Sequence, residues 1–469
     1  TDDADVMEGL IRAGVDVFRL NMSHGDMDEQ KRRAKLVRKT AKKLRWQVAL
    51  LVDLQGPKIR VENFAGGEAK LTGGDHFTLD ASDPATPGDH RRVGVSYPDL
   101  ANDVNPGDIL LLDDGLISMQ VQSLDNGRVH CLVENGGVLK NRKGLNLQGG
   151  GLSVSGLAEH DLPHIELAAE IGADYVAVSF VSNADDIDRA RGLLRKAGSE
   201  ASIVAKIERM EAIDNLEEIC DTADVIMVAR GDLGVEIGDE ELPGLQKRII
   251  RKGIRHNRIV ATATQMMQSM VENPIPTRAE VLDVANAVLD GTDAVMLSAE
   301  TAVGKHPVKV IEAMNRICLG AERHFEAEGD VVHLNVRFER IDQAIAMAAM
   351  YMATNVSVQA IVALTESGST AQWLSRVQSS VPIYAFSTNS ASRRKMAMFR
   401  DVFPVKQEAT SDDPDEVVGE AMRTLLAHGA VKDDDRIIVT MGDQMSKSGG
   451  TNTFRFIKLD AEGRARYRV

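Results

Sequence analysis

The sequence predicts an α/β fold, a (β/α)8 TIM barrel that carries an inserted all-β lid domain and is followed by a C-terminal α/β domain. The main observation is a set of seven short apolar runs, spaced at roughly 20 to 35 residues except between the second and the third. They lie at 16–20, 48–52, 175–180, 203–207, 225–229, 259–263 and 294–297. Each run is followed by a helical or looped stretch, and this alternation favours a closed parallel sheet.

The chain opens with a helical segment at residues 5–13 that ends at Gly14. A helix of such a barrel normally follows a strand, so the sequence predicts that one strand is missing and that the natural N-terminus is longer. Residues 1–57 are then the first part of the barrel.

The long interval at residues 58–156 is rich in Gly, Asp and Val and contains alternating runs such as 129–133. This pattern predicts an inserted β-barrel domain. Because the insertion leaves directly after the carboxyl end of a strand, it is placed to close over an active site as a lid.

The barrel is expected to resume over 157–327, and residues 328–469 are expected to form the C-terminal α/β regulatory domain. In that domain the pattern predicts a helix at 341–354 and strands at 360–364 and 437–440.

Composition excludes several classes of protein. A chain of 469 residues is long enough for two to four domains, and its net charge of −15 argues against an extended nucleic-acid or anionic-membrane partner. Cys131, Cys220 and Cys318 form no CxxC pair, so no disulfide framework or zinc site is indicated. We find no apolar run of membrane-spanning length and no signal-like start, and we expect a cytoplasmic protein.

The run at 203–208 ends with a cation and a carboxylate two residues apart, Lys206 and Glu208. Side chains at i and i+2 share a face of a strand, so both are expected at the barrel mouth. Asp232, after the next strand, supplies a second hard oxygen ligand for Mg²⁺. The structural alternative is that Asp232 caps the following helix and that Glu208 only pairs with Lys206.

Arg19, Asn21 and Ser23 alternate at the end of the first run, and a guanidinium fork suits a phosphate group. Lys58 and Arg60 add two cations after the second run, where they face either a nucleotide or only solvent. His24 taken alone is more often structural than functional.

Two further strand ends carry hydroxyl groups, at Thr264 and at Ser298, the latter close to Glu300. A hydroxyl group there can orient a substrate or relay a proton. The chain has no GxxxxGK[ST] loop and no GxGxxG after a strand, so common nucleotide-binding motifs are absent. Met266 and Met267 are expected in the core.

Together these segments resemble the pyruvate kinase family over essentially the whole chain. The resemblance is carried by residues 19–25 (RLNMSHG), 203–209 (IVAKIER), 227–234 (MVARGDLG), 263–266 (ATQM), 273–280 (NPIPTRAE) and 283–305. It implies transfer of a phosphoryl group from phosphoenolpyruvate to ADP, followed by protonation of enolpyruvate to pyruvate, with Mg²⁺ or Mn²⁺ as cofactor.

The resemblance also implies roles for individual residues. Those at the transferring phosphoryl group are Arg19 and Lys206, and the Mg²⁺ ligands are Glu208 and Asp232. The residues that hold the three-carbon substrate are Gly231, Asp232, Thr264 and Ser179. Those that meet ADP or ATP are Asn21, Ser23, His24, Arg60 and Lys143. Thr264 is the hydroxyl group expected near the proton relay.

Many members of the family require K⁺, bound at positions that match Asn21, Ser23, Asp53 and the backbone of Leu54. They carry Glu where this chain has Lys58. Three residues together, Leu54, Gln55 and Lys58, resemble the K⁺-independent branch of the family. We therefore hypothesise that the Lys58 ammonium replaces the ion and that K⁺ is not required.

The C-terminal segment from Thr365 to Thr370 resembles the effector loop of the family, with Ser367, Gly368 and Ser369 as further expected contacts. The alternative is an ordinary Ser/Thr helix cap. Glu366 would repel a second phosphate group, so a monophosphate is the expected allosteric effector. The resemblance also implies a homotetramer.

Two other classes stay open at this point. Mg²⁺-dependent carbon–carbon lyases also use barrels with Glu and Asp ligands, but they lack the inserted domain and need no ADP. A catalytically silent regulatory protein is the other alternative, and the presence of Lys206, Glu208, Asp232 and Thr264 argues against it.

Overall fold

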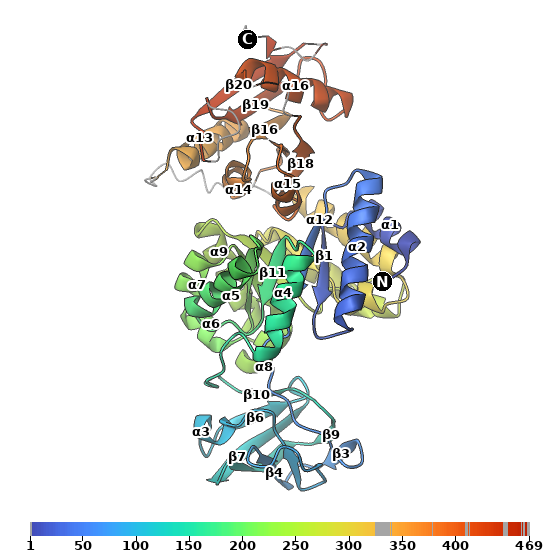
Figure 1. The fold of residues 1–469 in the computed structure, drawn as a ribbon, viewed down its shortest axis with the longest axis vertical. Coiled ribbons are helices and arrows are strands. Elements are labelled where there is room, and N and C mark those ends of the chain that lie inside the picture. The colour runs from blue at the N-terminus through green and yellow to red at the C-terminus, as the bar shows by residue number, and fades with distance from the viewer. Residues whose placement is uncertain are drawn as a thin grey trace.

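The computed structural model of the chain has three parts along its longest axis, with the barrel between the inserted β domain and the C-terminal domain (Figure 1). It describes residues 2–323, 338, 340–377, 379–408, 411, 413–443, 449–460, 462 and 465–466. The predicted boundary between 327 and 328 lies outside the described residues. Within the described part, no helix has the length and apolar character that crossing a membrane requires.

The barrel sheet has seven parallel strands, and each begins at or next to its predicted residue. Their order in space is β1 (Val17–Asn21), β2 (Ala49–Asp53), β11 (Tyr175–Val178), β12 (Ser202–Ile207), β13 (Val225–Ala229), β14 (Ile259–Ala263) and β15 (Ala294–Met296). In register, Arg19 lies opposite Leu51 and Lys206 opposite Met227. All the carboxyl ends therefore meet at one mouth.

Helices cover the outside of this sheet. They are α1 (Ala4–Ala13), α2 (Met27–Leu44), α4 (Leu162–Glu170), α5 (Ala184–Lys196), α6 (Met210–Asp214), α7 (Leu216–Thr222), α8 (Arg230–Ile237), α9 (Leu242–Arg255), α10 (Arg278–Leu289), α11 (Ala299–Ala302) and α12 (Pro307–Arg323), with 3-10 turns at Glu159–Asp161 and Gln268–Val271. The predicted first helix is confirmed. Asp3 accepts hydrogen bonds from its first turn, and Gly14, with a φ of 111°, ends it.

Each central strand is buried on both faces, which explains why the sequence shows continuous apolar runs. In β12, Ile203, Ala205 and Ile207 pack toward the helices, whereas Val204 lies in the core inside the barrel. Lys206 follows Val204 by two residues and so points to the inside. The pleat of one strand therefore delivers an ammonium group to the barrel mouth.

The inserted domain has its own core, from Ile59 to Leu152. Its larger sheet has the order β10 (Leu145–Leu147), β6 (Ile109–Leu112), β7 (Ile117–Asp125), β8 (Arg128–Asn135), β4 (His76–Asp80) and β5 (Arg92–Gly94). A second ladder joins β3 (Glu68–Leu71) to β9 (Gly137–Lys140), and α3 (Leu100–Asp103) is a short helix. The alternation at 129–133 is confirmed, because Val129, Cys131 and Val133 are buried in β8.

The C-terminal domain is a mixed sheet with helices on both faces. The strand order is β18 (Val402–Lys406), β17 (Ile383–Ser387), β16 (Ala360–Leu364), β19 (Arg436–Met441), β20 (Thr453–Leu459) and β21 (Ala465–Arg466). Its helices are α13 (Ile341–Asn355), α14 (Ser369–Ser375), α15 (Ser390–Met396) and α16 (Pro414–Ala427). The predicted helix and both predicted strands are present.

The C-terminal domain contacts the barrel at the amino ends of the barrel strands. Arg394 of α15 pairs with the buried carboxylate of Asp174 at 2.8 Å, and the Tyr175 hydroxyl donates to the Lys395 carbonyl at 2.7 Å. Met398 packs into the core inside the barrel. This contact lies opposite the mouth that carries Lys206.

Candidate active site

The barrel mouth holds a chain of four alternating charges. The Lys206 ammonium lies 2.9 Å from Glu208 Oε1 and 3.4 Å from Asp53 Oδ1, and it donates to Ser179 Oγ at 2.8 Å. The other oxygen of Asp53 accepts from Arg19 Nε at 2.6 Å. The structure thus brings together residues from β1, β2, β12 and the end of β11.

Burial makes these interactions strong. The side chains of Asp53 and Glu208 are 1 % and 3 % exposed, whereas Lys206 and Arg19 keep 12 % and 23 % of theirs in contact with solvent. Charges in a low-dielectric setting interact more strongly than charges in water. The two cations are therefore accessible to solvent, whereas the two carboxylates beneath them are buried. A site for an anionic substrate requires such accessible cations.

The pKa shifts follow from this arrangement. Burial is the largest single influence on both Asp53 and Lys206 and disfavours their charged forms, but all their opposite charges and hydrogen bonds together outweigh it, so the pKa of Asp53 is lowered and that of Lys206 is raised. Arg19 adds to the lowering at Asp53. Burial raises the pKa of Glu208, Lys206 opposes that rise, and the Asp232 carboxylate adds to it.

Asp232 lies in the first turn of α8, directly after β13, and no side-chain cap of that helix is formed. Its Oδ1 accepts from Lys58 Nζ at 2.7 Å. The capping alternative for Asp232 is therefore not what the structure shows. The other half of that alternative, a pair between Glu208 and Lys206, is present.

The residues present fit a Mg²⁺ ion. Glu208 and Asp232 follow neighbouring strands, and the charge of Asp232 disfavours ionisation of Glu208. Two carboxylates that repel each other are relieved by a shared divalent cation, and carboxylate oxygens are the ligands that Mg²⁺ prefers. In the described part of the chain no group of three or more His, Cys, Asp or Glu residues is arranged to hold a metal. Two carboxylate ligands alone would leave coordination positions of a Mg²⁺ ion for substrate and water.

Thr264 lies at the end of β14 in an unusual backbone conformation. Its φ is 73°, which is costly for a β-branched residue and is found mostly at functional sites. Its Oγ1 accepts from the Gly231 N–H at 2.8 Å and donates to the Ala263 carbonyl at 2.6 Å. The structure therefore joins two of the residues expected to hold the substrate.

The expected nucleotide residues fall into two groups. Asn21, Ser23 and His24 form the turn after β1, where Asn21 Oδ1 accepts from the Ser23 N–H at 3.0 Å. Arg60 and Lys143 lie on adjacent segments of the inserted domain, since Arg60 bridges to Gly144. Lys143 pairs with Asp113 at 2.7 Å. The first group thus lies on the barrel and the second on the inserted domain.

Of the residues of the expected K⁺ site, Asp53 is the one that contacts protein cations among the residues that the structure describes. Both oxygens of Asp53 contact Arg19 or Lys206. The Lys58 ammonium lies 2.7 Å from Asp232 and 3.8 Å from Asp114, so it pairs with Asp232, an expected Mg²⁺ ligand, and not with Asp53. The cation nearest Asp53 Oδ1 is Lys206 instead.

The hydroxyl groups of the expected effector loop make bonds within the C-terminal domain. Thr365 Oγ1 accepts from the Gly368 N–H at 3.0 Å, Ser367 Oγ from the Ser369 N–H at 3.4 Å, and Thr370 Oγ1 lies 2.7 Å from Thr451 Oγ1. Glu366 accepts from Thr388 Oγ1 at 3.0 Å. These bonds hold the turn before α14, but the N-cap of that helix is Gly368 and no side chain caps it, so the Ser/Thr cap of the alternative is not what the structure shows.

Sequence reasoning missed several residues that support the mouth. Asp161 is fully buried and accepts from the Gln55 N–H at 3.0 Å. Arg209 donates to the Val154 carbonyl at 3.0 Å and so holds the segment that returns from the inserted domain. Glu300, which the sequence marks only as a carboxylate at a strand end, is buried and accepts from Met267 and Ser298 N–H groups. No local pattern predicts these partners, because all but Ser298 are distant in sequence.

The fold and the site define a class: a magnesium-dependent phosphotransferase built on a (β/α)8 barrel. Comparison with known proteins makes the assignment specific. The pyruvate kinase barrel domain matches residues 1–311, and the pyruvate kinase alpha/beta domain matches residues 343–457. The chain belongs to the pyruvate kinase family, whose members act on phosphoenolpyruvate, ADP and pyruvate.

Individual relatives agree along nearly the whole length. The chain is 49 % identical to pyruvate kinase II of Salmonella typhimurium over 98 % of this chain and 96 % of the relative. It is 48 % identical to a pyruvate kinase of Haemophilus influenzae over 97 % and 95 %. A crystal structure of a pyruvate kinase from Cryptosporidium parvum superposes with a TM-score of 0.92 at 30 % identity, covering 97 % of this chain and 93 % of that one.

Proposed function

We propose that this chain carries out the reaction of its family with Lys206 as the residue on which phosphoryl transfer depends most. The observation that carries the proposal is the position of its ammonium, which three buried side chains hold at the inner mouth of the barrel. Phosphoryl transfer needs positioning and charge neutralisation more than covalent help. A fixed cation meets both needs because it has no reorganisation to undergo.

The roles of the other residues follow from their chemistry. Arg19, oriented by Asp53, presents its free N–H groups to the same phosphoryl oxygens. Glu208 and Asp232 would hold Mg²⁺, which when bound supplies charge neutralisation at the phosphoryl group and the enolate oxygen. Gly231 and Thr264 position the three-carbon unit, and Ser179 keeps the Lys206 ammonium in place. Thr264 Oγ1 relays a proton toward the methylene carbon of enolpyruvate.

A coupled assay of pyruvate release tests this assignment. Phosphoenolpyruvate, ADP and Mg²⁺ together are expected to give pyruvate and ATP in equal amounts, and omission of ADP or Mg²⁺ is expected to abolish release. Pyruvate release that proceeds equally well without ADP would instead favour the lyase alternative. Asn21, Ser23, His24, Arg60 and Lys143 are the residues proposed to contact the nucleotide.

We further propose that the enzyme works without K⁺. The support is the cation content of the mouth, where Lys58 lies on Asp232 while Lys206 and Arg19 neutralise Asp53. A bound ammonium supplies the positive charge that a monovalent ion would otherwise bring. Leu54, Ser23 and Asn21 then have no ion to hold.

Regulation by a phosphate monoester at the loop 365–370, a homotetrameric assembly and a cytoplasmic location remain proposals that rest on the family resemblance. Titration of sugar monophosphates, with half-saturation for phosphoenolpyruvate as the readout, tests the first. Ser367→Glu would block the loop with a carboxylate, and an effect that persists in this variant would place the effector elsewhere. Light scattering of the purified protein tests the assembly.

A further inference from the structure

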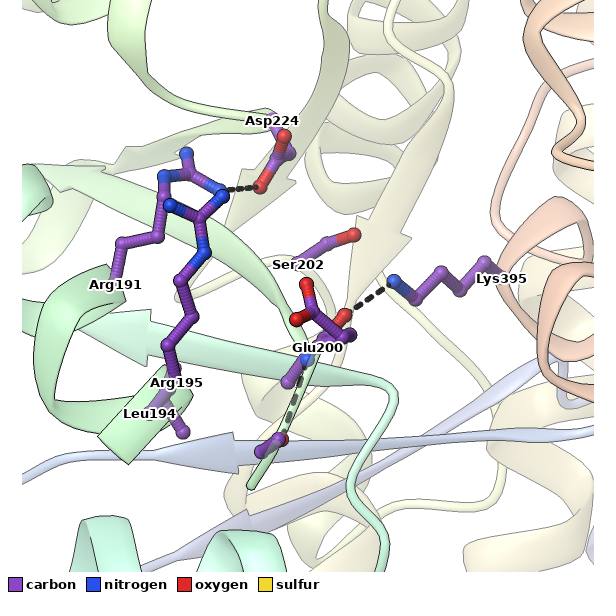
Figure 2. Close-up of a pocket in the computed structure, with 9 residues that line it drawn as sticks. Arg191, Leu194, Arg195, Glu200, Ser202, Asp224 and Lys395 are labelled. Atoms are coloured by element: carbon purple, nitrogen blue, oxygen red, sulfur yellow. Dashed lines mark hydrogen bonds and ion pairs between the residues drawn. The ribbon is translucent and has the colours of Figure 1, made fainter. Parts of the chain in front are cut away.

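A cavity of about 210 Å³ lies between the barrel and the C-terminal domain, away from the active site (Figure 2). Its lining comes from α5, from the segment that leads into β12, from Asp224 directly before β13, and from Lys395 of α15. We call it the interdomain cavity. The strand β12 starts here at Ser202 and carries Lys206 at its other end, so the cavity and the active site lie at opposite ends of one strand.

Three cations line this cavity. Arg191 and Arg195 are one helical turn apart on α5, and Lys395 reaches in from the other domain (Figure 2). Cations at i and i+4 share a helix face and repel each other. Arg195 lies in the last turn of α5 and Lys395 in the last turn of α15, so a helix dipole stabilises each of them in part.

One of the two carboxylates that line the cavity is already engaged. Asp224 Oδ2 accepts from Arg191 at 3.0 Å and from the Ile203 N–H at 2.7 Å. Arg195 has no carboxylate within ion-pair distance among the residues that the structure describes. The remaining positive charge in the lining is therefore that of Arg195 and Lys395, set against the exposed side chain of Glu200.

Lys395 is held in an unusual way. Its ammonium donates to the Glu200 carbonyl at 2.7 Å, which uses one of its three N–H donors. Burial lowers its pKa, because the ammonium gives up water without gaining a carboxylate partner at bonding distance. An anion in the cavity would supply the missing acceptors, and the hydroxyl groups of Ser199 and Ser202 would add donors.

We propose that the interdomain cavity binds a small phosphate-bearing anion, with Arg195 and Lys395 as its main cationic contacts. The planar guanidinium fork matches phosphate oxygens in geometry, and a lysine adds a point charge. The cavity has room for more than a few water molecules, so both free phosphate and a small phosphate monoester share the required chemistry. This site is separate from the loop 365–370, none of whose residues lines it.

The test is calorimetric titration of the full-length protein with inorganic phosphate, and separately with glycerol phosphate. Mg²⁺, nucleotide and phosphoenolpyruvate are all left out, because phosphoenolpyruvate is itself a phosphate monoester and would compete for the cavity. We expect a binding event in the wild type that depends on the residues lining the cavity. Arg195→Gln and Lys395→Met should each raise the dissociation constant at least tenfold, and Lys196→Gln should leave it unchanged, because Lys196 carries the same charge on the same helix but does not line the cavity.

The two ligands distinguish the sources of the phosphate group. Tighter binding of glycerol phosphate supports a phosphorylated metabolite, and tighter binding of inorganic phosphate supports the free ion. Absence of binding to either ligand overturns the proposal. Binding that all three variants weaken equally marks an adventitious ion only and overturns it as well. Because pyruvate release is measured separately, failure here leaves the assignment of the active site untouched.

Discussion

Lys58 Nζ lies 2.7 Å from Asp232 Oδ1, although the two residues are 174 positions apart in the chain. Lys58 belongs to the segment that leads from β2 into the inserted domain, and Asp232 opens α8 of the barrel. The pair therefore ties the root of the inserted domain to a carboxylate proposed to bind Mg²⁺. We therefore expect metal binding at Asp232 to depend on the position of this segment through the Lys58 ammonium.

Lys58 is expected to make the enzyme independent of K⁺. The wild type should reach full activity in buffer without potassium, whereas Lys58→Glu should be slow there and regain activity when K⁺ is added, because the new carboxylate lacks the ammonium charge and can bind a cation beside Asp232 instead. Initial rates across a K⁺ titration measure this. Lys70→Met, at an exposed lysine of the inserted domain, is the control. Strong activation of the wild type by K⁺ would contradict the hypothesis.

Replacement of Lys206 is expected to remove most turnover. Lys206→Met deletes a preorganised charge at the transferring group, so kcat should fall by roughly 10²- to 10³-fold. Binding of Mn²⁺, followed by its electron paramagnetic resonance signal, should persist because Glu208 and Asp232 are intact. Lys140→Met, at an exposed lysine, is the matched control. Wild-type turnover in Lys206→Met would refute the proposed role.

Thr264 is expected to act through its hydroxyl group. Thr264→Ala should lower kcat by roughly 10²-fold, a typical loss for a proton-transfer residue. Loss of the bond to the Gly231 N–H should also cost about 1 kcal/mol of stability. Thr264→Ser keeps the oxygen and should retain most activity. Equal rates for the Ala and Ser variants would show that the oxygen has no part in the reaction.

Glu236 should make stability depend on pH. It is a buried residue of α8 whose Oε2 accepts from the Met210 N–H at 3.0 Å, and burial raises its pKa from 4.5 to about 7. The folded state thus keeps a proton that the unfolded chain loses. Stability from this group is complete below pH 4.5 and falls as the pH rises to about 7, by roughly 3 kcal/mol in total.

The matching variant is Glu236→Gln, which stays neutral and can still accept the bond from Met210. It should match the wild type near pH 4.5 and unfold at a higher temperature at pH 8. Thermal unfolding at the two pH values is the measurement, with Glu240→Gln at an exposed position as control. If the gain is the same at both pH values, the titration of Glu236 is not its cause.

The sequence contains enough information for the barrel strands, because a strand buried on both faces must be a continuous apolar run. It also predicts that Lys206 and Glu208 lie together, since both follow from the pleat of β12. It could not predict that Lys58 would pair with Asp232 and not with Asp53, or that Asp161 would accept a hydrogen bond from the Gln55 N–H. Those partners are set by how the insertion and the barrel pack, and no periodicity encodes that geometry.

Met398 packs among side chains that point into the barrel, beside Tyr175 and Ile259, while Asp174 shares its buried carboxylate between Arg38 and Arg394. The C-terminal domain thus covers the end of the barrel that lies opposite the active site. Without the C-terminal domain, the barrel would expose the apolar side chains that Met398 covers. Asp174 would also lose Arg394, one of its two cationic partners. Attempts to dissect the enzyme into halves should therefore yield aggregates, and functional studies belong on the intact polypeptide.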